Sequence, residues 1–376
     1  MPLLADLSDL RDRLQDELFP WLTAEVGPLS GKMKQFVTVL EMCPIGAFLT
    51  ACRGLPGRPP ADRPALARAF IAKAVLAIPT TSLLIERLHS DQTLRQLCGW
   101  QRIGAVPSEA TFSRAFAEFA AAALPARVHE ALVIATHKNR LVGHVSRDAT
   151  AIEAREKPVK VESPKRCRKK VRPKKGEPGY EGVRRLERQQ EMTVAEMLRD
   201  LPKHCAVGRK PNSKGNNAIW IGFKLHVDTA DGGIPLTCLL TSASLHDSQA
   251  AIPLAHMTSW RVLYLYELMD SAYHAPEIMA VSRALGHVPI IAEQARGDKA
   301  RKAEMAAEAR ARKRINYQPA EAVRFGERSV AERVNARLKD EFGGRFVRVR
   351  GHAKVMCHLM FGILALTVDQ LMRLTI

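Results

Sequence analysis

The chain has few features of a secreted, membrane-spanning or zinc-binding protein. Its 376 residues include seven scattered cysteines, and no two of them have the two-residue spacing of a zinc knuckle. Scattered cysteines are typical of free thiols in a reducing compartment. The first residues contain neither a basic region nor a signal cleavage site, so we expect no signal peptide and a cytoplasmic location.

Long apolar runs are also scarce. The longest, residues 355–368, is interrupted by His358 and is shorter than the roughly 20 residues that a membrane-spanning helix needs. We therefore interpret this run as a buried C-terminal helix and expect no membrane partner.

Acidic residues are outnumbered by basic ones. The chain has 57 Lys and Arg against 39 Asp and Glu, a formal net charge of +18. Such a charge favours a polyanionic partner, and nucleic acid is the best fit. Aromatic residues make up only 6%, but a hydrophobic content of 46% is enough for packed cores, and the length allows two domains.

Acidic residues occur in places where burial would be costly. Residues 144–152 predict a short strand that contains Asp148, and residues 264–270 predict a buried strand that ends at Asp270, with a helix from about Pro276. Unpaired carboxylates in such strands are unfavourable, which points to a ligand. Together with Glu332, these aspartates would suit a pair of Mg²⁺ ions.

Glu332 lies on a predicted helix whose two faces differ. Phe325, Arg328, Glu332 and Lys339 all fall within roughly 40° of Glu332, at about 100° per residue. The opposite face is apolar and can pack against a core, through Val330, Val334 and Leu338. A carboxylate flanked by cations suits a metal ion beside phosphates, whereas the alternative is a solvated face with ordinary ion pairs.

Taken together, these segments resemble the DDE transposases of bacterial insertion sequences. Asp148, Asp270 and Glu332 look like the DDE triad, and the helix is similar to the Y-R-E-K signature of the cut-and-paste group, with Phe325 in place of Tyr. Other segments that resemble the family in the same order are Pro107–Arg114, Gly222–Asp228, Thr241–Ser248 and Asp270–Tyr273, the last followed by His274 where Asp is common. The resemblance covers nearly the whole chain.

The resemblance implies a fold and a chemistry. The fold would be α/β, with a ribonuclease H-like catalytic core, an N-terminal all-α domain and an inserted basic tract. The triad would hold Mg²⁺, for which Mn²⁺ can substitute, and would cleave the element ends and join the 3′-ends to target DNA. Arg328 and Lys339 would bind phosphates, and Phe325 would stack on a displaced base or simply pack. Because two double-stranded ends must meet, we expect a homodimer on DNA, associated with the nucleoid.

The chain divides into two expected domains. Residues 1–140 form an N-terminal helical domain that we expect to bind DNA, since 31–140 has helical periodicity. Residues 141–376 form the catalytic domain, in which strands and helices alternate around a hairpin of 218–227 and 234–241.

A basic insertion, residues 155–178, interrupts the catalytic domain. Residues 155–175 contain eleven Lys or Arg, two Glu and three Pro, a composition that cannot form a packed core. We expect a disordered strap that binds DNA phosphates through Lys169, Lys170, Lys174 and Lys175. A solvated linker is the alternative.

Several polar residues remain as weaker site candidates. We expect five of the acids to cap helices or lie on the surface: Asp228, Asp247, Glu267, Glu293 and Asp298. His226 and His246 either form hydrogen bonds within the hairpin or lie near the metal ions. Two rival functions also remain, a catalytically silent DNA-binding derivative of a transposase and a nuclease on the same fold.

Overall fold

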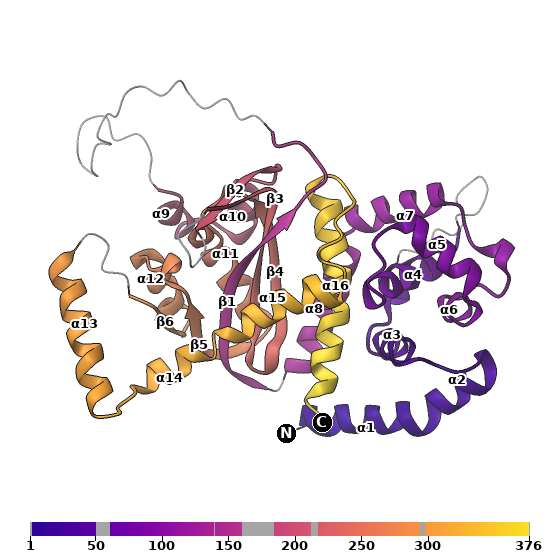
Figure 1. Cartoon of the computed structure of the whole chain (residues 1–376), viewed down its shortest axis with the longest axis horizontal. Helices are drawn as coiled ribbons and strands as arrows, with labels where there is room; N and C mark the ends of the chain where they lie inside the picture. The colour runs from indigo at the N-terminus through magenta and orange to yellow at the C-terminus, as the bar shows by residue number, and fades with distance from the viewer. Residues whose placement is uncertain are drawn as a thin grey trace.

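The protein has a mixed α/β architecture, seen in a computed structural model that describes residues 2–49, 61–138, 140–159, 184–211, 217–293 and 298–375. Within these residues, a six-stranded mixed sheet is covered by helices on both faces. A group of N-terminal helices lies beside the sheet, with the C-terminal helix between them (Figure 1).

The N-terminal helices come from a sequence with the helical periodicity expected for 31–140. They are α1 (Pro2–Arg13), α2 (Phe19–Val26), α3 (Gly31–Met42), α4 (Arg63–Val75), α5 (Thr81–Ser90), α6 (Gln92–Cys98), α7 (Glu109–Ala121) and α8 (Leu124–His137). Side-chain caps begin several of them; Asp62, for example, accepts a hydrogen bond from the backbone of Ala65 at the start of α4. The apolar stripe of α7 is buried, as Phe112, Phe116 and Phe119 show.

The sheet brings the two expected acidic strands side by side. Its strands are β1 (Leu141–Glu153), β2 (Ala206–Pro211), β3 (Asn217–Ala230), β4 (Ile234–Ser242), β5 (Leu263–Met269) and β6 (Val288–Ile291). The order is β4-β3-β1-β5-β6, and β2 pairs with the first part of β3. Strands β1, β5 and β6 are parallel, whereas β3 is antiparallel to β1 and β4. The predicted hairpin is β3–β4, with its turn at Asp231–Gly233.

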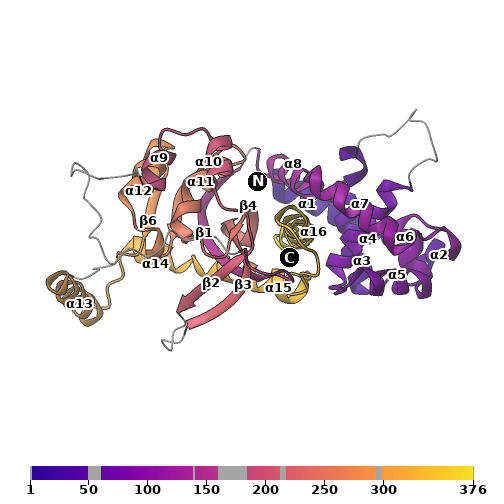
Figure 2. The same cartoon turned by 90° about the horizontal axis from the view of Figure 1, so that it is seen from above.

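The remaining helices cover or flank the sheet. They are α9 (Arg185–Gln189), α10 (Val194–Asp200), α11 (Ala251–Ser259), α12 (Pro276–Ala284), α13 (Lys299–Arg314), α14 (Ala320–Gly326), α15 (Ser329–Glu341) and α16 (His352–Arg373). Helices α9–α12 lie on one side of the sheet, and α15 and α16 lie on the other (Figure 2). The basic helix α13 has no buried residue.

Helix α16 is the centre of the hydrophobic core. It packs against α3, α4, α7, α8 and β4, and one apolar cluster includes Phe70 of α4, Phe361 of α16 and Leu225 of β3. The expected buried C-terminal helix is therefore confirmed, but our expectation that no segment is long enough to span a membrane was wrong. With 22 residues, α16 passes that test of length and composition, and 72% of its apolar window is buried inside the protein.

Two other expectations were wrong in detail. The charge-rich sequence of residues 181–200 favours a single helix, but its described part, 184–200, forms two short helices, α9 and α10. Thr193 starts the second, because its side chain and that of Glu196 each accept the other's backbone N–H. Strand β2 was not predicted, since its sequence Ala-Val-Gly-Arg-Lys-Pro is poor in β-branched residues; its pairing with β3 determines its conformation.

We expect Gly362→Ala to destabilise the fold. A Cβ atom at this position would lie 2.7 Å from the carbonyl oxygen of Phe342 and 2.9 Å from Leu338 Cδ1. Overpacking of this kind costs about 1–3 kcal/mol of unfolding free energy. As the control, Gly326→Ala in α14 meets nothing within 4 Å and should stabilise slightly, because Gly is disfavoured in helices. Urea unfolding of both variants measures the difference, and a shift of the same sign in both would contradict the close packing of α16 on α15.

Candidate active site

Asp148 and Asp270 lie at neighbouring positions on adjacent parallel strands. The β1–β5 register ends with the pair Arg147 and Met269, and the two aspartates follow directly. Both carboxylates are half-buried. Burial raises the pKa of Asp148, and the negative charge of Asp270 adds to the rise, whereas the charges of Lys210 and Arg328 oppose it. The sheet thus brings together two of the three predicted acids.

Helix α15 lies across this pair and contributes an amide. Asn335 donates a hydrogen bond from Nδ2 to Asp148 Oδ2 at 3.0 Å. The Asn335 side chain is buried, and its Oδ1 has no hydrogen-bond partner among the described residues. The helix packs as predicted through its apolar face, because Val330, Val334 and Leu338 are all buried.

Glu332 lies on α15, about one turn before Asn335, and faces solvent. Its side chain is 57% exposed and accepts a hydrogen bond from Arg328 Nη2 at 2.7 Å. Among the described residues, no group of three Asp, Glu, His or Cys side chains is close enough to hold a metal ion together. The structure therefore joins Asp148 and Asp270 and leaves Glu332 paired with Arg328.

The donor atoms present at this site suit a hard divalent cation. The two aspartates offer carboxylate oxygens, and Asn335, which bonds to Asp148 through Nδ2, has an amide oxygen without a hydrogen-bond partner among the described residues. Oxygen ligands of this kind are those that Mg²⁺ and Mn²⁺ prefer.

The predicted single helix through residues 325–339 is two helices in the structure. Phe325 lies in α14, Arg328 lies in the break, and Glu332 and Lys339 lie in α15. At the break, the backbone hydrogen bonds are of the 3₁₀ type, three residues apart. The N–H of Val330 donates to the carbonyl oxygen of Glu327, and the N–H of Ala331 donates to that of Arg328. The Arg328 guanidinium still lies over the Phe325 ring, 5.8 Å from its centre.

Two further cations belong to elements that surround the aspartates. Lys339 is half-buried, and its pKa is lowered by burial and by the charge of Arg345, while Glu153 acts in the opposite direction. Lys210, at the end of β2, lies close enough to affect the pKa values of both Asp148 and Lys339. Sequence reasoning missed Lys210 because it missed the strand. The other predicted cations, Lys169, Lys170, Lys174 and Lys175, lie outside the described residues.

A buried ion network lies behind the aspartates, on the opposite face of the sheet. Arg147 donates two hydrogen bonds of 2.8 Å to the oxygens of Asp228 and one of 3.3 Å to Glu267. Tyr264 donates to Glu267 at 2.7 Å, and Thr258 donates to Asp228 at 2.7 Å. Our expectation that Asp228 and Glu267 cap helices or lie on the surface was wrong, since both are at most 1% exposed.

Arg147 lowers the pKa of Glu267 within this network. Burial alone would raise the pKa of Glu267, but the charge of Arg147 and the Tyr264 hydroxyl outweigh it and hold that pKa below its usual value. In return, the two carboxylates raise the pKa of Arg147 despite its burial. Strands β3, β1 and β5 are thereby tied together next to Asp148.

The other weaker candidates have structural partners. Asp247 pairs with Lys224 at 2.7 Å, Glu293 pairs with Arg301 at 2.9 Å, and Asp298 caps α13. His226 is buried, bonds to Thr241 at 2.8 Å, and has its pKa lowered to about 4 by burial. It pairs in register with Ala149, so it faces away from Asp148. His246 bonds to Ser248 at 2.8 Å, within the turn that follows β4.

Comparison with known families identifies two matches. A family model described as a transposase DDE domain matches residues 148–368, more than half of the chain, and this range contains Asp148, Asp270 and Glu332. A second family model, described as a transposase domain, matches residues 32–118 among the N-terminal helices. No curated protein and no solved structure matches the chain significantly.

We expect Asp228→Asn to lower the free energy of unfolding by about 3–5 kcal/mol, because it leaves the Arg147 charge buried without its main partner. The matched control is Asp340→Asn, whose partner Arg345 is 62% exposed and whose loss costs at most about 1 kcal/mol. Denaturant unfolding of both variants provides the measurement. Equal losses would show that the buried network has no special part in holding the three strands.

Proposed function

Because the chain belongs to the DDE transposase family, a family of enzymes that cut and join DNA, we propose that it cleaves the ends of an insertion sequence and joins the 3′-ends to target DNA. The observation that carries this proposal is the adjacency of Asp148 and Asp270 beneath α15. The family domain implies a ribonuclease H-like core, and the order β4-β3-β1-β5-β6 with parallel β1, β5 and β6 supports it. The proposal assigns the chain to the group with the Y-R-E-K signature, with Phe325 in the first position.

Asp148, Asp270 and Glu332 would hold the divalent ions in this proposal, Mg²⁺ or its substitute Mn²⁺. When bound, such ions activate the attacking oxygen and stabilise the leaving oxygen of an in-line phosphoryl transfer. Asn335 fixes the Asp148 carboxylate through its hydrogen bond, and Arg328 and Lys339 bind phosphates beside the scissile bond.

The Glu332–Arg328 pair can exchange partners at little cost. Exposed pairs of this kind contribute about 0–1 kcal/mol, and the Glu332 side chain is 57% exposed. A DNA phosphate can therefore replace Glu332 at Arg328, which frees Glu332 to turn toward the aspartates.

In this proposal, different parts of the chain have different roles. Residues 1–140 act as a DNA-binding domain, and residues 141–376 act as the catalytic domain. The insertion 155–178 binds DNA phosphates, and two chains act as a homodimer on the element ends, in the nucleoid and without a membrane. Within the family, the rival readings are a silent DNA-binding derivative and a nuclease that does not join ends.

Amide variants of the triad test the function. We expect Asp148→Asn, Asp270→Asn and Glu332→Gln each to reduce cleavage and joining by at least about a hundredfold, since each removes several kcal/mol of charge stabilisation. Binding to end DNA should survive, because phosphate contacts come from other residues. Glu321→Gln on the exposed surface of α14 is the matched control. Cleavage of labelled end DNA and joining of pre-cleaved ends are measured with Mg²⁺, Mn²⁺, Ca²⁺ or EDTA.

Each outcome of this assay separates the alternatives. Cleavage without joining favours a nuclease, and DNA binding without either reaction favours a silent derivative. Full activity in EDTA contradicts the metal mechanism, and near-normal cleavage by Glu332→Gln removes that residue from the triad.

The lysines of the insertion make a separate prediction. If all four contact duplex phosphates, replacing Lys169, Lys170, Lys174 and Lys175 by Gln should flatten the slope of log affinity against log salt by about three to four units. Preference between end and scrambled DNA should change little, because phosphate contacts carry little sequence information. Affinities for both DNAs across a salt series give the slope; an unchanged slope would make the insertion a linker.

A further inference from the structure

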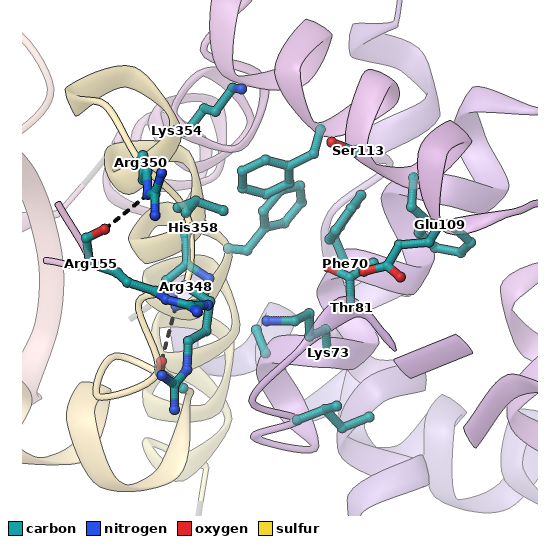
Figure 3. Close-up of a pocket in the computed structure, with 17 residues that line it drawn as sticks. Phe70, Lys73, Thr81, Glu109, Ser113, Arg155, Arg348, Arg350, Lys354 and His358 are labelled. Atoms are coloured by element: carbon teal, nitrogen blue, oxygen red, sulfur yellow. Dashed lines mark hydrogen bonds between the residues drawn. The ribbon is translucent and has the colours of Figure 1, made fainter. Parts of the chain in front are cut away.

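A pocket of about 440 Å³ lies between the N-terminal helices and the segment that joins α15 to α16. Helices α4 and α7 form one wall, and α16 with residues 343–354 forms the other (Figure 3). Arg155, two residues after the end of β1, also lines it. The pocket therefore begins where the strand that carries Asp148 ends.

The walls of this pocket are strongly basic. They carry one acid, Glu109, and five cations: Lys73, Arg155, Arg348, Arg350 and Lys354. Among the described residues, none of these cations lies within 4.0 Å of a carboxylate. Arg350 is held in place by a hydrogen bond from its Nε to the carbonyl oxygen of Arg155 at 3.0 Å. This concentration of uncompensated charge attracts an anion.

Lys73 is the cation that most needs such a partner. The residue is only 8% exposed. Its one side-chain hydrogen bond among the described residues is donated to the carbonyl oxygen of Pro79, at 3.5 Å. Burial lowers its pKa to about 8, so the amine is mainly protonated at neutral pH. Figure 3 shows its ammonium group pointing across the pocket toward the wall that holds Arg348 and His358. A buried ammonium without a carboxylate is costly, and a bound anion would offset the cost.

Aromatic side chains form the floor of the pocket. Phe70, Phe112, Phe116 and Phe361 line it, and the rings of Phe70 and Phe361 are stacked with their centres 5.8 Å apart. Aromatic side chains provide a surface for planar bases, whereas cations beside them bind phosphate.

We propose that this pocket binds a nucleoside phosphate, with its phosphate at the cations around Lys73 and its base against the phenylalanines. The volume falls within the range of about 300–1,000 Å³ that is typical of small-ligand sites. The same chemistry occurs in a free nucleotide and in an unpaired nucleotide of a DNA strand. Binding of an unpaired DNA nucleotide rests on the proposed function, whereas binding of a free nucleotide does not.

Calorimetry with the full-length protein tests the site, using dAMP, deoxyadenosine and inorganic phosphate as probes. We expect dAMP to bind at least about tenfold more tightly than either fragment, because it alone uses both parts of the pocket. Lys73→Met and Arg348→Gln should each weaken dAMP binding about tenfold or more through the loss of a charge-assisted contact. Arg348 is exposed, so its variant keeps the test valid if Lys73→Met fails to fold. Arg102→Gln, an exposed cation away from the pocket, is the control and should bind dAMP normally.

Competition experiments identify the source. Displacement of dAMP by a duplex with an unpaired 3′-nucleotide, but not by a blunt duplex, assigns the site to DNA; displacement by neither assigns it to a free nucleotide. Equal binding of dAMP and phosphate, or normal dAMP binding by both pocket variants, overturns the inference. Asp148→Asn should retain dAMP binding, so DNA cleavage without dAMP binding refutes only the pocket, and dAMP binding without cleavage refutes only the proposed function.

Discussion

The ion network of Arg147, Asp228 and Glu267 is the constraint on which the geometry of the candidate site depends. Each member comes from a different strand, and the three strands are β1, β3 and β5. Such a buried network adds little net stability, because desolvation of the charges offsets their attraction. What it provides is alignment, since any shift of β1 against its neighbours would separate buried charges. Asp148 follows Arg147 directly, so the network also fixes the position of Asp148 beside Asp270.

Helix α15 connects this frame to the rest of the molecule. Its apolar face packs into the core. Because Gly362 has no side chain, α16 can lie close to Leu338 and to Phe342 at the C-terminal end of α15. Because α16 also packs against α4, α7 and α8, the N-terminal helices and α15 share one hydrophobic cluster. Helix α16 therefore connects the packing of the N-terminal helices to that of the helix that carries Glu332.

The sequence was sufficient to predict the elements that depend on local pattern. The strands with Asp148 and Asp270, the β3–β4 hairpin and the apolar face of α15 all have the expected periodicity, and the family resemblance was confirmed by the match over 148–368. What could not be predicted depends on partners distant in sequence. Asp228 and Glu267 looked like surface acids because their common partner, Arg147, is recognised only once the strands are paired.

The same limit applies to the active site and to the pocket. Strand β2, and with it Lys210, owes its conformation to pairing with β3 and has no strong strand signal of its own. Asn335 had one available signal, since it lies about one turn after Glu332 on the same helix. The pocket had none, because its walls come from α4, α7, α16 and the end of β1.

Electrostatics explains why Glu332 lies apart from the two aspartates. Burial and the charge of Asp270 both raise the pKa of Asp148. A third carboxylate at the same point would add repulsion that a partly buried site screens poorly. Arg328 relieves this by pairing with Glu332 while its charge also acts on Asp148. In the proposed function, Glu332 would join the aspartates only when a cation lies between the carboxylates, and this move would release Arg328 for an anion. In the same proposal, cation binding by the acids and phosphate binding by Arg328 would therefore favour each other, which would couple assembly of the site to the presence of DNA.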